Sequence, residues 1–480
     1  MLFNRLLVIM QRSTDMQKYF GYELSQQPTS LFKDNYMRKT EKAQLAKEIR
    51  KDCLSAVVPC GTRCGVDGGY LLRAVVWTKG STYDDVCYQY VNFIGKNFGS
   101  SAVVVFDGYV TGASTKDHEH KRRATRCSPD IVVDRLKTAY HDQSSFLCND
   151  ANKSEFIALL TEVLQSLSFL VYQAQDDADT MIVKVAMEFA LAKEAINVIA
   201  NDTDVLVMLV YHYKPEMGDI YMTARTSQFV YSVGDLTRSL GSAAQHLLAI
   251  HAVSGCDTAS SLYGHGKVSV FKKLRVHAEI QSCLAVLECP TSSHEDVMDA
   301  GHKVLVLLYG GNATDSLNYL RHSMYMHATT TNSRLPQPER LPPTENAARY
   351  HLYRVHLQSV QWKLFSTSCL SPLEWGWKLH NGSYIPIATD LAIAPPEILK
   401  VSCCKCSMGA KRPCGTRACV CVRYGLSCIA ASKSCTGSSC ENGRDHDIGD
   451  EIETADADVY DVMSDDQLDC IIPWTVEEEV

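Results

Sequence analysis

Short apolar runs that end on or near an aspartate are the feature that most constrains the fold of this chain. Four of them predict a buried strand or a strand end: GVDGGYLL (65–72), SAVVVFDGY (101–109), SFLVYQAQ (168–175) and INVIAND (196–202). Two further segments have apolar residues at helical spacing: DTMIVKVAMEFALAKE (179–194) and GDLTRSLGSAAQHLLAIHAV (234–253). Strands that alternate with helices are typical of α/β proteins, so we predict a largely parallel central sheet flanked by helices.

Aspartates recur where these runs finish. The series is Asp67, Asp107, Asp177, Asp179, Asp202, Asp204 and Asp257. Because the carboxyl ends of parallel strands meet at one edge of a sheet, we expect these side chains to converge. Carboxylates so close together need cations, and all-oxygen ligation suits Mg²⁺, or Mn²⁺ in its place, in a site that hydrolyses phosphodiesters. Each aspartate taken alone is equally compatible with a helix N-cap.

The order of these acids resembles the flap-endonuclease branch of the PIN-like nucleases, over residues 65–275. The resemblance implies that the seven acids bind two metal ions that cut DNA at branched junctions. Two neighbouring motifs, STKDHEHKRR (114–123) and SLYGHGKVSVFKKL (261–274), strengthen it. The first implies a grip on the scissile phosphate by Lys116, Lys121, Arg122 and Arg123, and the second a glycine turn that seats a duplex backbone through Gly264, Gly266 and Lys267.

This chain departs from that family in two respects. Asp177 and Asp179 stand where the relatives usually carry glutamates, which moves each carboxylate closer to the backbone. No long clamp region is evident between Asp107 and Asp177, so a preference for branched substrates need not transfer. The basic run also fits a solvated helix face, and two glycines in a loop are ordinary.

Nine of the 20 cysteines are concentrated near the C-terminus, in a pattern typical of tetrahedral zinc sites. They are Cys403, Cys404, Cys406, Cys414, Cys419, Cys421, Cys428, Cys435 and Cys440. The cluster resembles the CXC domain of tesmin-like chromatin proteins, which implies nine cysteines that hold three zinc ions and basic residues that contact DNA. A cysteine of those relatives is missing between Cys428 and Cys435, so either Cys403 compensates or one zinc is lost. The expected DNA contacts are Lys411, Arg412, Arg417 and Arg423.

Charge is unevenly distributed along the chain. Residues 441–480 contain 15 acidic residues and one arginine, a net of −14 in a chain of net charge −8, so the first 440 residues carry +6. A basic body suits a protein that meets DNA, or RNA in its place. No apolar run is long enough to span a membrane and no secretion signal is evident, so we expect an intracellular, nuclear protein.

These features predict six successive segments. They are a helical lead-in (1–60), a PIN-like nuclease-type domain (61–328), a Pro-rich linker (329–346), a helical and irregular connector (347–400), a CXC-like zinc domain (401–442) and an acidic disordered tail (443–480). The whole chain also resembles uncharacterised animal proteins, some related to mobile elements, through TSLFKD, VFDGY, DTDVL, GCDT, LPPT and WGWKL.

Three functions remain open on this basis. The first is a metal-dependent nuclease that acts on DNA or structured nucleic acid, with a zinc domain that assists DNA binding. The second is a non-catalytic DNA-binding or chromatin-associated protein with a decayed nuclease fold. The third is a scaffold whose zinc cluster binds protein. The seven acids favour the first, because a site that has lost its activity usually loses some of its acids.

Overall fold

The chain folds into two compact units, each built from separate stretches of sequence. The computed structural model describes residues 16–51, 53–108, 114–116, 128–174, 178–224, 229–331, 337–396, 404, 406, 414–423, 428, 435 and 440–442. The larger unit, called here the sheet unit, comprises Leu31–Val304 and Ala348–Ala388. The other comprises Met1–Ser30, Leu305–Ala347 and Thr389–Val480. The acidic tail predicted at 443–480 lies outside the described residues, and the predicted domain limits remain a prediction.

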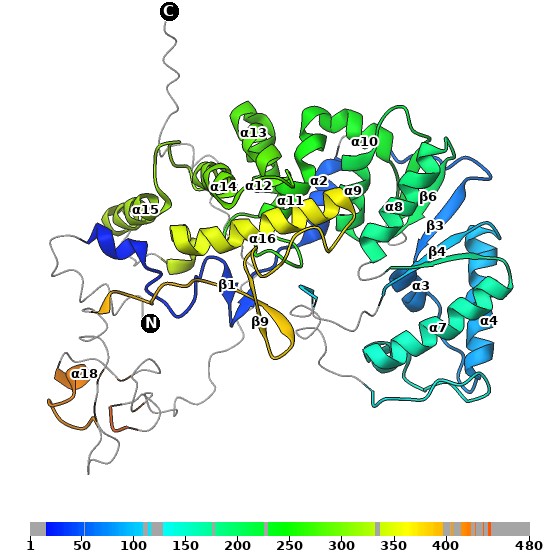
Figure 1. Ribbon diagram of the computed structural model, residues 1–480, viewed down its shortest axis with the longest axis horizontal. Helices are drawn as coiled ribbons and strands as arrows, with labels where there is room; N and C mark the ends of the chain where they lie inside the picture. The colour runs from blue at the N-terminus through cyan, green and yellow to red at the C-terminus, as the bar shows by residue number, and fades with distance from the viewer. Residues whose placement is uncertain are drawn as a thin grey trace, which may run out of the picture. The chain divides into compact units, whose positions relative to one another are not determined.

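A six-stranded, mostly parallel sheet forms the centre of the sheet unit (Figure 1). The strand order is β5-β4-β3-β6-β7-β8, and only the last pair, β7 with β8, is antiparallel. The strands are β3 (Arg63–Asp67), β4 (Val103–Phe106), β5 (Leu170–Gln173), β6 (Ile196–Ile199), β7 (Ile220–Ala224) and β8 (Phe229–Ser232). The predicted α/β class with a largely parallel sheet is therefore confirmed.

Helices cover both faces of the sheet, which explains the continuous apolar runs of its central strands. Val104 and Phe106 of β4 pack into a core with α3 (Gly68–Ala74), α4 (Tyr83–Phe98), α6 (Gln143–Leu147) and α7 (Asp150–Ser166). Side chains alternate along a strand, so Val103 and Val105 face the other way, and both are also fully buried. On that face α8 (Ala178–Leu191) packs against β3, β4 and β6 (Figure 1).

Two expectations about the strands need correction. The run at 168–175 forms β5, but this strand is the sheet edge rather than a buried strand, and Leu170 is 46% exposed. The β7–β8 pair was not predicted at all. Its residues alternate in burial, Ile220 and Met222 being buried, as expected for a strand covered on one side.

The helical predictions hold with one interruption. The segment 234–253 is divided into α10 (Val233–Leu240), the 3-10 helix η2 (Gly241–His246) and α11 (Leu247–Val253). The break falls at Gly241, whose φ of 56° lies outside the helical region. The segment predicted as a helical and irregular connector (347–400) contains most of the long helix α16 (Glu345–Leu364).

The remaining elements complete the two units. In the sheet unit they are β1 (Phe32–Lys33), β2 (Tyr36–Met37), α2 (Lys42–Ile49), α9 (Thr203–His212), α12 (Lys267–Val276), α13 (Ala278–Leu287), β9 (Trp377–His380) and β10 (Ser383–Pro386). Helix α14 (His294–Leu308) begins in the sheet unit and ends in the other. The second unit also contains η1 (Gln17–Gly21), α15 (Leu317–Thr331), η3 (Pro338–Arg340) and α18 (Val420–Arg423).

The second unit has its own small core around a buried ion pair. Phe20 and Tyr325 pack together with their ring centroids 5.1 Å apart. The buried Arg321 lies 3.5 Å from the Glu23 carboxylate and donates to the Glu23 carbonyl oxygen. Across the described parts of both units, no helix is long and apolar enough to cross a membrane.

Acid sensitivity is expected from His351, a fully buried residue of α16. Neither of its ring nitrogens has a hydrogen-bond partner among the described residues, and burial lowers its pKa to about 3. Its unfolded pKa is near 6.5, so the unfolded chain binds a proton that the folded chain excludes, and stability falls as the pH drops below about 6.5. Urea unfolding at pH 7.5 and at pH 5.0 gives the decrease in the free energy of unfolding between these two pH values. In His351→Leu this decrease should be about 2 kcal/mol smaller than in the unaltered protein.

The exposed His380 of β9 offers a matched control for that measurement. His380→Leu should leave the pH dependence of unfolding unchanged within about 0.3 kcal/mol, as is usual for a surface position. Equal pH dependence in the His351→Leu and unaltered proteins would contradict the assignment of acid sensitivity to this residue.

Candidate metal centres

The first two acids of the series lie at the carboxyl ends of adjacent parallel strands. Asp67 ends β3 and is the N-cap of α3, where its carboxylate accepts from the Gly69 backbone N–H at 2.9 Å. Asp107 follows β4 and accepts from the Ala178 N–H, the first residue of α8, at 3.3 Å. Burial and the charge of Asp107 raise the pKa of Asp67 to about 6. The N-cap role and proximity to the other acids therefore coexist in Asp67.

The next two acids of the series, Asp202 and Asp204, lie at the start of α9, directly after β6. Asp202 is the N-cap of α9 and accepts from the Asp204 N–H at 2.8 Å. Burial and the charge of Asp204 raise the pKa of Asp202 to about 6. The apolar run that follows Asp204 is this helix, whose residues from Thr203 to Val210 are all buried. The second acid is consequently carried into the interior, where Asp204 is 3% exposed.

Asp204 is held on both sides by cationic or donor groups. Its Oδ2 lies 2.8 Å from Nζ of Lys42, and its Oδ1 lies 2.7 Å from Nε2 of His251. Burial opposes the negative charge, but Lys42 and His251 outweigh it and hold the pKa of Asp204 well below its usual range. Lys42 also contacts Asp257, with 3.1 Å between Nζ and Oδ2.

His251 is fixed in turn by a buried lysine. Nζ of Lys267 donates to Nδ1 of His251 at 2.9 Å, and also to the His251 carbonyl and the Ser254 hydroxyl. With Nδ1 accepting, Nε2 carries the ring proton and donates to Asp204. Burial lowers the pKa of His251 to about 4, so the ring stays neutral, and it stacks on Trp362 with 5.4 Å between centroids.

The structure brings six of the seven predicted acids into this region, and Asp177 lies outside the described residues. Oxygen atoms of Asp179, Asp202 and Asp204 lie within 4.8 Å of one another, a spacing that could hold a metal ion. Asp67 is electrostatically coupled to Asp202, and Asp204 is linked to Asp257 through Lys42. Burial and the charge of neighbouring carboxylates both raise the pKa values of Asp67 and Asp202, and an all-carboxylate donor set of this kind fits a divalent cation.

Basic side chains lie at the rim of the acidic cluster. Nζ of Lys116 is 3.7 Å from Asp179, and Nζ of Lys153 on α7 is 3.2 Å from Asp107. Lys121, Arg122 and Arg123 lie outside the described residues. Of the four residues predicted to bind the scissile phosphate, Lys116 is therefore the one that lies within the described part of the chain.

The predicted duplex-binding turn requires one correction. Gly264 has a φ of +80° and Gly266 precedes α12, and a Cβ added at either would meet nothing within 4 Å. Lys267, by contrast, is fully buried and donates to groups of α11 and its C-cap. An ammonium enclosed in this way does not reach a phosphate, so its predicted contact with nucleic acid is wrong.

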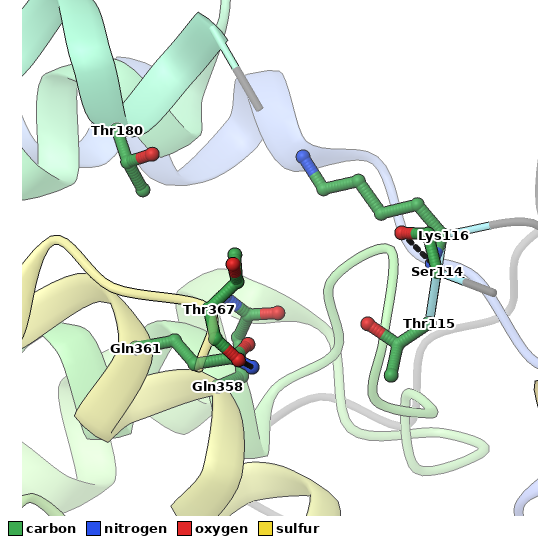
Figure 2. A pocket seen from close by; sticks show the side chains of 7 residues that line it. All are labelled: Ser114, Thr115, Lys116, Thr180, Gln358, Gln361 and Thr367. Atoms are coloured by element: carbon green, nitrogen blue, oxygen red, sulfur yellow. Dashed lines mark hydrogen bonds between the residues drawn. The ribbon is translucent and has the colours of Figure 1, made fainter. Parts of the chain in front are cut away.

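A small polar cleft adjoins Asp179. It is lined by Ser114, Thr115, Lys116, Thr180, Gln358, Gln361 and Thr367. Figure 2 shows the Lys116 side chain extending towards Thr180 of α8, with the glutamines of α16 on another wall. Hydroxyl, amide and ammonium groups are suited to hydrogen bonds with phosphate and sugar oxygens.

Gly68 is needed for the close approach of α3 to β4 that sets Asp67 beside Asp107. A Cβ at this position would lie 2.3 Å from a Phe106 ring carbon and 2.7 Å from the Val105 carbonyl oxygen. Gly68→Ala should therefore lower the free energy of unfolding by about 3 kcal/mol, as overpacking does. Urea unfolding provides the measurement.

Gly95 of α4 is the matched control, because a Cβ there meets nothing within 4 Å. Gly95→Ala should raise stability by about 0.5–1 kcal/mol, since alanine has the higher helix propensity. If Gly68→Ala lowers the free energy of unfolding by less than about 1 kcal/mol, the overpacking argument is contradicted.

The cysteine cluster forms a second candidate metal centre. Three groups of four thiols could each hold a metal ion: Cys404/Cys406/Cys414/Cys419, Cys404/Cys414/Cys428/Cys435 and Cys404/Cys419/Cys421/Cys428. The Sγ atom of Cys404 lies 3.5 Å from Cys435, 3.6 Å from Cys414 and 3.9 Å from Cys428. All three groups share Cys404, so bridging thiolates would connect adjacent ions.

Other residues predicted for this centre are only partly described. Cys440 lies beside the cluster, outside the three groups of four. Cys403, Lys411 and Arg412 lie outside the described residues, as does the Arg423 side chain. Arg417 is exposed on the described part.

Several residues of the acidic site were not found from the sequence. They are Lys39, Lys42, Lys153, His251, Gln358 and Gln361. Each comes from a segment whose local pattern indicates only a polar lead-in or a helix. Their position beside the acids arises from packing between segments far apart in the chain.

No protein-family model matches the chain, and no curated protein sequence matches it either. Solved structures similar to parts of the chain have low identity and low TM-scores. The catalytic core of Rad2 in complex with DNA substrate is 18% identical, with a TM-score of 0.29 over 44% of this chain and 59% of that core. The T5 D15 protein co-crystallised with metal ions is 12% identical, with a TM-score of 0.34 over 63% of this chain and 90% of that protein. The chain thus spans less than two thirds of the Rad2 core.

Proposed function

We propose that this protein is a divalent-metal-dependent nuclease that acts on DNA or structured nucleic acid at the carboxyl edge of its sheet. The observation that carries the proposal is the convergence of six described carboxylates from β3, β4, α8, β6–α9 and the loop after α11. Among the described residues, lysines contact Asp204, Asp257, Asp179 and Asp107, whereas Asp67 and Asp202 form no ion pair. The identity of the ion, Mg²⁺ or Mn²⁺, is part of the proposal.

The side chains have distinct tasks in this mechanism. A bound divalent ion would neutralise charge on the phosphodiester and make a water molecule a better nucleophile. Asp179, Asp202 and Asp204 would hold it, with Asp67 and Asp107 beside them. Lys116 would bind a phosphate oxygen at the cleft, where Ser114 and Thr115 offer hydroxyl groups.

The cysteine cluster would bind Zn²⁺ and assist DNA binding. Grouped thiols favour zinc over hard cations, and the exposed Arg417 is placed on the surface of this region. A nuclear location fits a protein with these two centres. The CXC type of zinc domain and its contacts through Lys411, Arg412 and Arg423 belong to the same proposal.

Cleavage assays with a charge-removing variant test the nuclease function. Asparagine caps helices about as well as aspartate, so Asp67→Asn with Asp202→Asn removes two charges while keeping both N-caps. The full-length protein would be incubated with single-stranded, duplex and branched DNA and with RNA, with Mg²⁺, Mn²⁺ or EDTA. We expect metal-dependent cleavage that falls by more than about 100-fold in the double variant.

Asp235→Asn is the control, because Asp235 forms an exposed ion pair with Arg238. It should cleave like the unaltered protein. Cleavage that survives in the double variant, or no cleavage of any substrate, would refute the nuclease function.

A non-catalytic DNA-binding protein is the second candidate. It is favoured by one observation, the engagement of both Asp204 oxygens by Lys42 and His251. DNA binding that depends on zinc, without cleavage in any metal, would select this alternative.

A further inference from the structure

Lys42 lies among the acids through a set of fixed contacts. It is the first residue of α2, which packs against α9 and α12 through its buried face. The preceding residues are held as well: the Ser261 N–H donates to the Arg38 carbonyl at 2.8 Å. Nζ of Lys39 donates to the carbonyl oxygens of Cys256 and Asp257 at 3.1 and 2.9 Å. The backbone that carries Lys42 is therefore anchored to the loop that carries Asp257.

The ammonium of Lys42 bridges two carboxylates from different loops. Its Nζ lies 2.8 Å from Asp204 and 3.1 Å from Asp257. Burial disfavours its charge, but the fields of Asp204, Asp202 and Asp257 exceed that effect and raise the pKa of Lys42 above its usual range. Its single positive charge offsets one of the two negative charges of Asp204 and Asp257.

The other described acids of the cluster differ in their charge balance. Asp67 and Asp202 form no ion pair with a described lysine or arginine, and Asp107 and Asp179 contact lysines at 3.2 and 3.7 Å. Among the described residues, Asp204 and Asp257 therefore share one tightly bound ammonium, whereas Asp67 and Asp202 pair with no lysine or arginine. The oxygens of Asp204 accept from Lys42 and His251, and Asp204 also lies at metal-ligand spacing from Asp179 and Asp202.

We propose that Lys42 takes the place of a second divalent ion, so that the site binds one metal ion rather than two. Asp204 and Asp257 bind the lysine, and the one metal ion would lie among Asp179, Asp202 and Asp204, with Asp67 and Asp107 beside them. This inference rests on the proposed metal-dependent function. It assigns to Lys42 a positioning role, because the lysine acts by holding Asp204 and Asp257 and by excluding a cation.

Mn²⁺ binding by the full-length zinc-loaded protein tests the inference without reference to activity. Titrations followed by electron paramagnetic resonance would count bound Mn²⁺ in the unaltered protein, Lys42→Gln and Lys42→Arg. A variant with Asp67→Asn, Asp107→Asn, Asp202→Asn and Asp257→Asn supplies the background from the other carboxylates, including those of the 441–480 segment. After subtraction we expect one ion in the unaltered protein, two in Lys42→Gln and one in Lys42→Arg.

The outcomes separate this inference from the proposed function. Two ions in the unaltered protein would overturn the inference and leave the nuclease proposal standing. The inference also fails if Lys42→Gln binds one ion or Lys42→Arg binds two. No binding above background in any of the three proteins would refute both proposals. The count in the unaltered protein keeps the test decisive even if Lys42→Gln does not fold.

Discussion

Replacing Asp204 with asparagine is expected to lower the free energy of unfolding by about 3 kcal/mol, because it removes one partner from a largely buried ion pair. An asparagine oxygen can still accept from His251, but its amide group would then face the Lys42 ammonium at the 2.8 Å contact. Two donors would oppose each other, and Lys42 would retain only Asp257. Urea unfolding at pH 7.5 without added metal measures the loss.

Asp235→Asn serves as the matched control here too. Its ion pair with Arg238 is exposed, so the change should cost less than about 0.5 kcal/mol. A loss below about 1 kcal/mol for Asp204→Asn would show that the Lys42–Asp204–His251 contacts do not organise the interior of this unit.

Replacing Cys404 with serine is expected to remove most of the bound zinc. All three candidate groups contain this thiolate, so its loss breaks each of them, and serine is a poor zinc ligand. Structural zinc contributes on the order of 10 kcal/mol to the folding of small zinc domains, so the cysteine-rich segment should become sensitive to protease. Zinc would be measured by mass spectrometry of the purified protein, and stability by limited proteolysis.

Cys60→Ser is the control, because Cys60 is exposed and lies outside the three groups. It should keep the full zinc content and the same proteolysis pattern. Zinc retained by Cys404→Ser at the level of this control would contradict the shared-ligand arrangement.

The central strands could be predicted because their environment leaves a continuous apolar signal. All residues of strands β4 and β6 are buried, and a continuous apolar run such as VVVF is typical of a strand that is covered on both faces. The edge strand β5 was misjudged because an apolar run does not reveal whether a helix covers it. The division of 234–253 into three pieces depends on the positive φ of Gly241, which helical spacing alone does not indicate.

Within the site, the acids were identifiable and their partners were not. Asp67, Asp107 and Asp202 follow strands, so a parallel sheet necessarily brings them to one edge. Lys42 is 162 residues from Asp204, and His251 is 47 residues from it. Lys267 was assigned to a phosphate because it follows two glycines, yet packing of α12 against α11 buries it.

The sequence by itself therefore determined the central parallel strands, the acidic residues at their carboxyl ends and the cysteine-rich segment, because each depends on local pattern and on the geometry of parallel strands. Only the tertiary structure decided which cation meets which acid. A lysine has the same local appearance on a surface, at a rim such as that occupied by Lys116, or inside, as Lys267 is. Its role depends on the helices that pack around it, and in Lys42 that packing places an ammonium between Asp204 and Asp257.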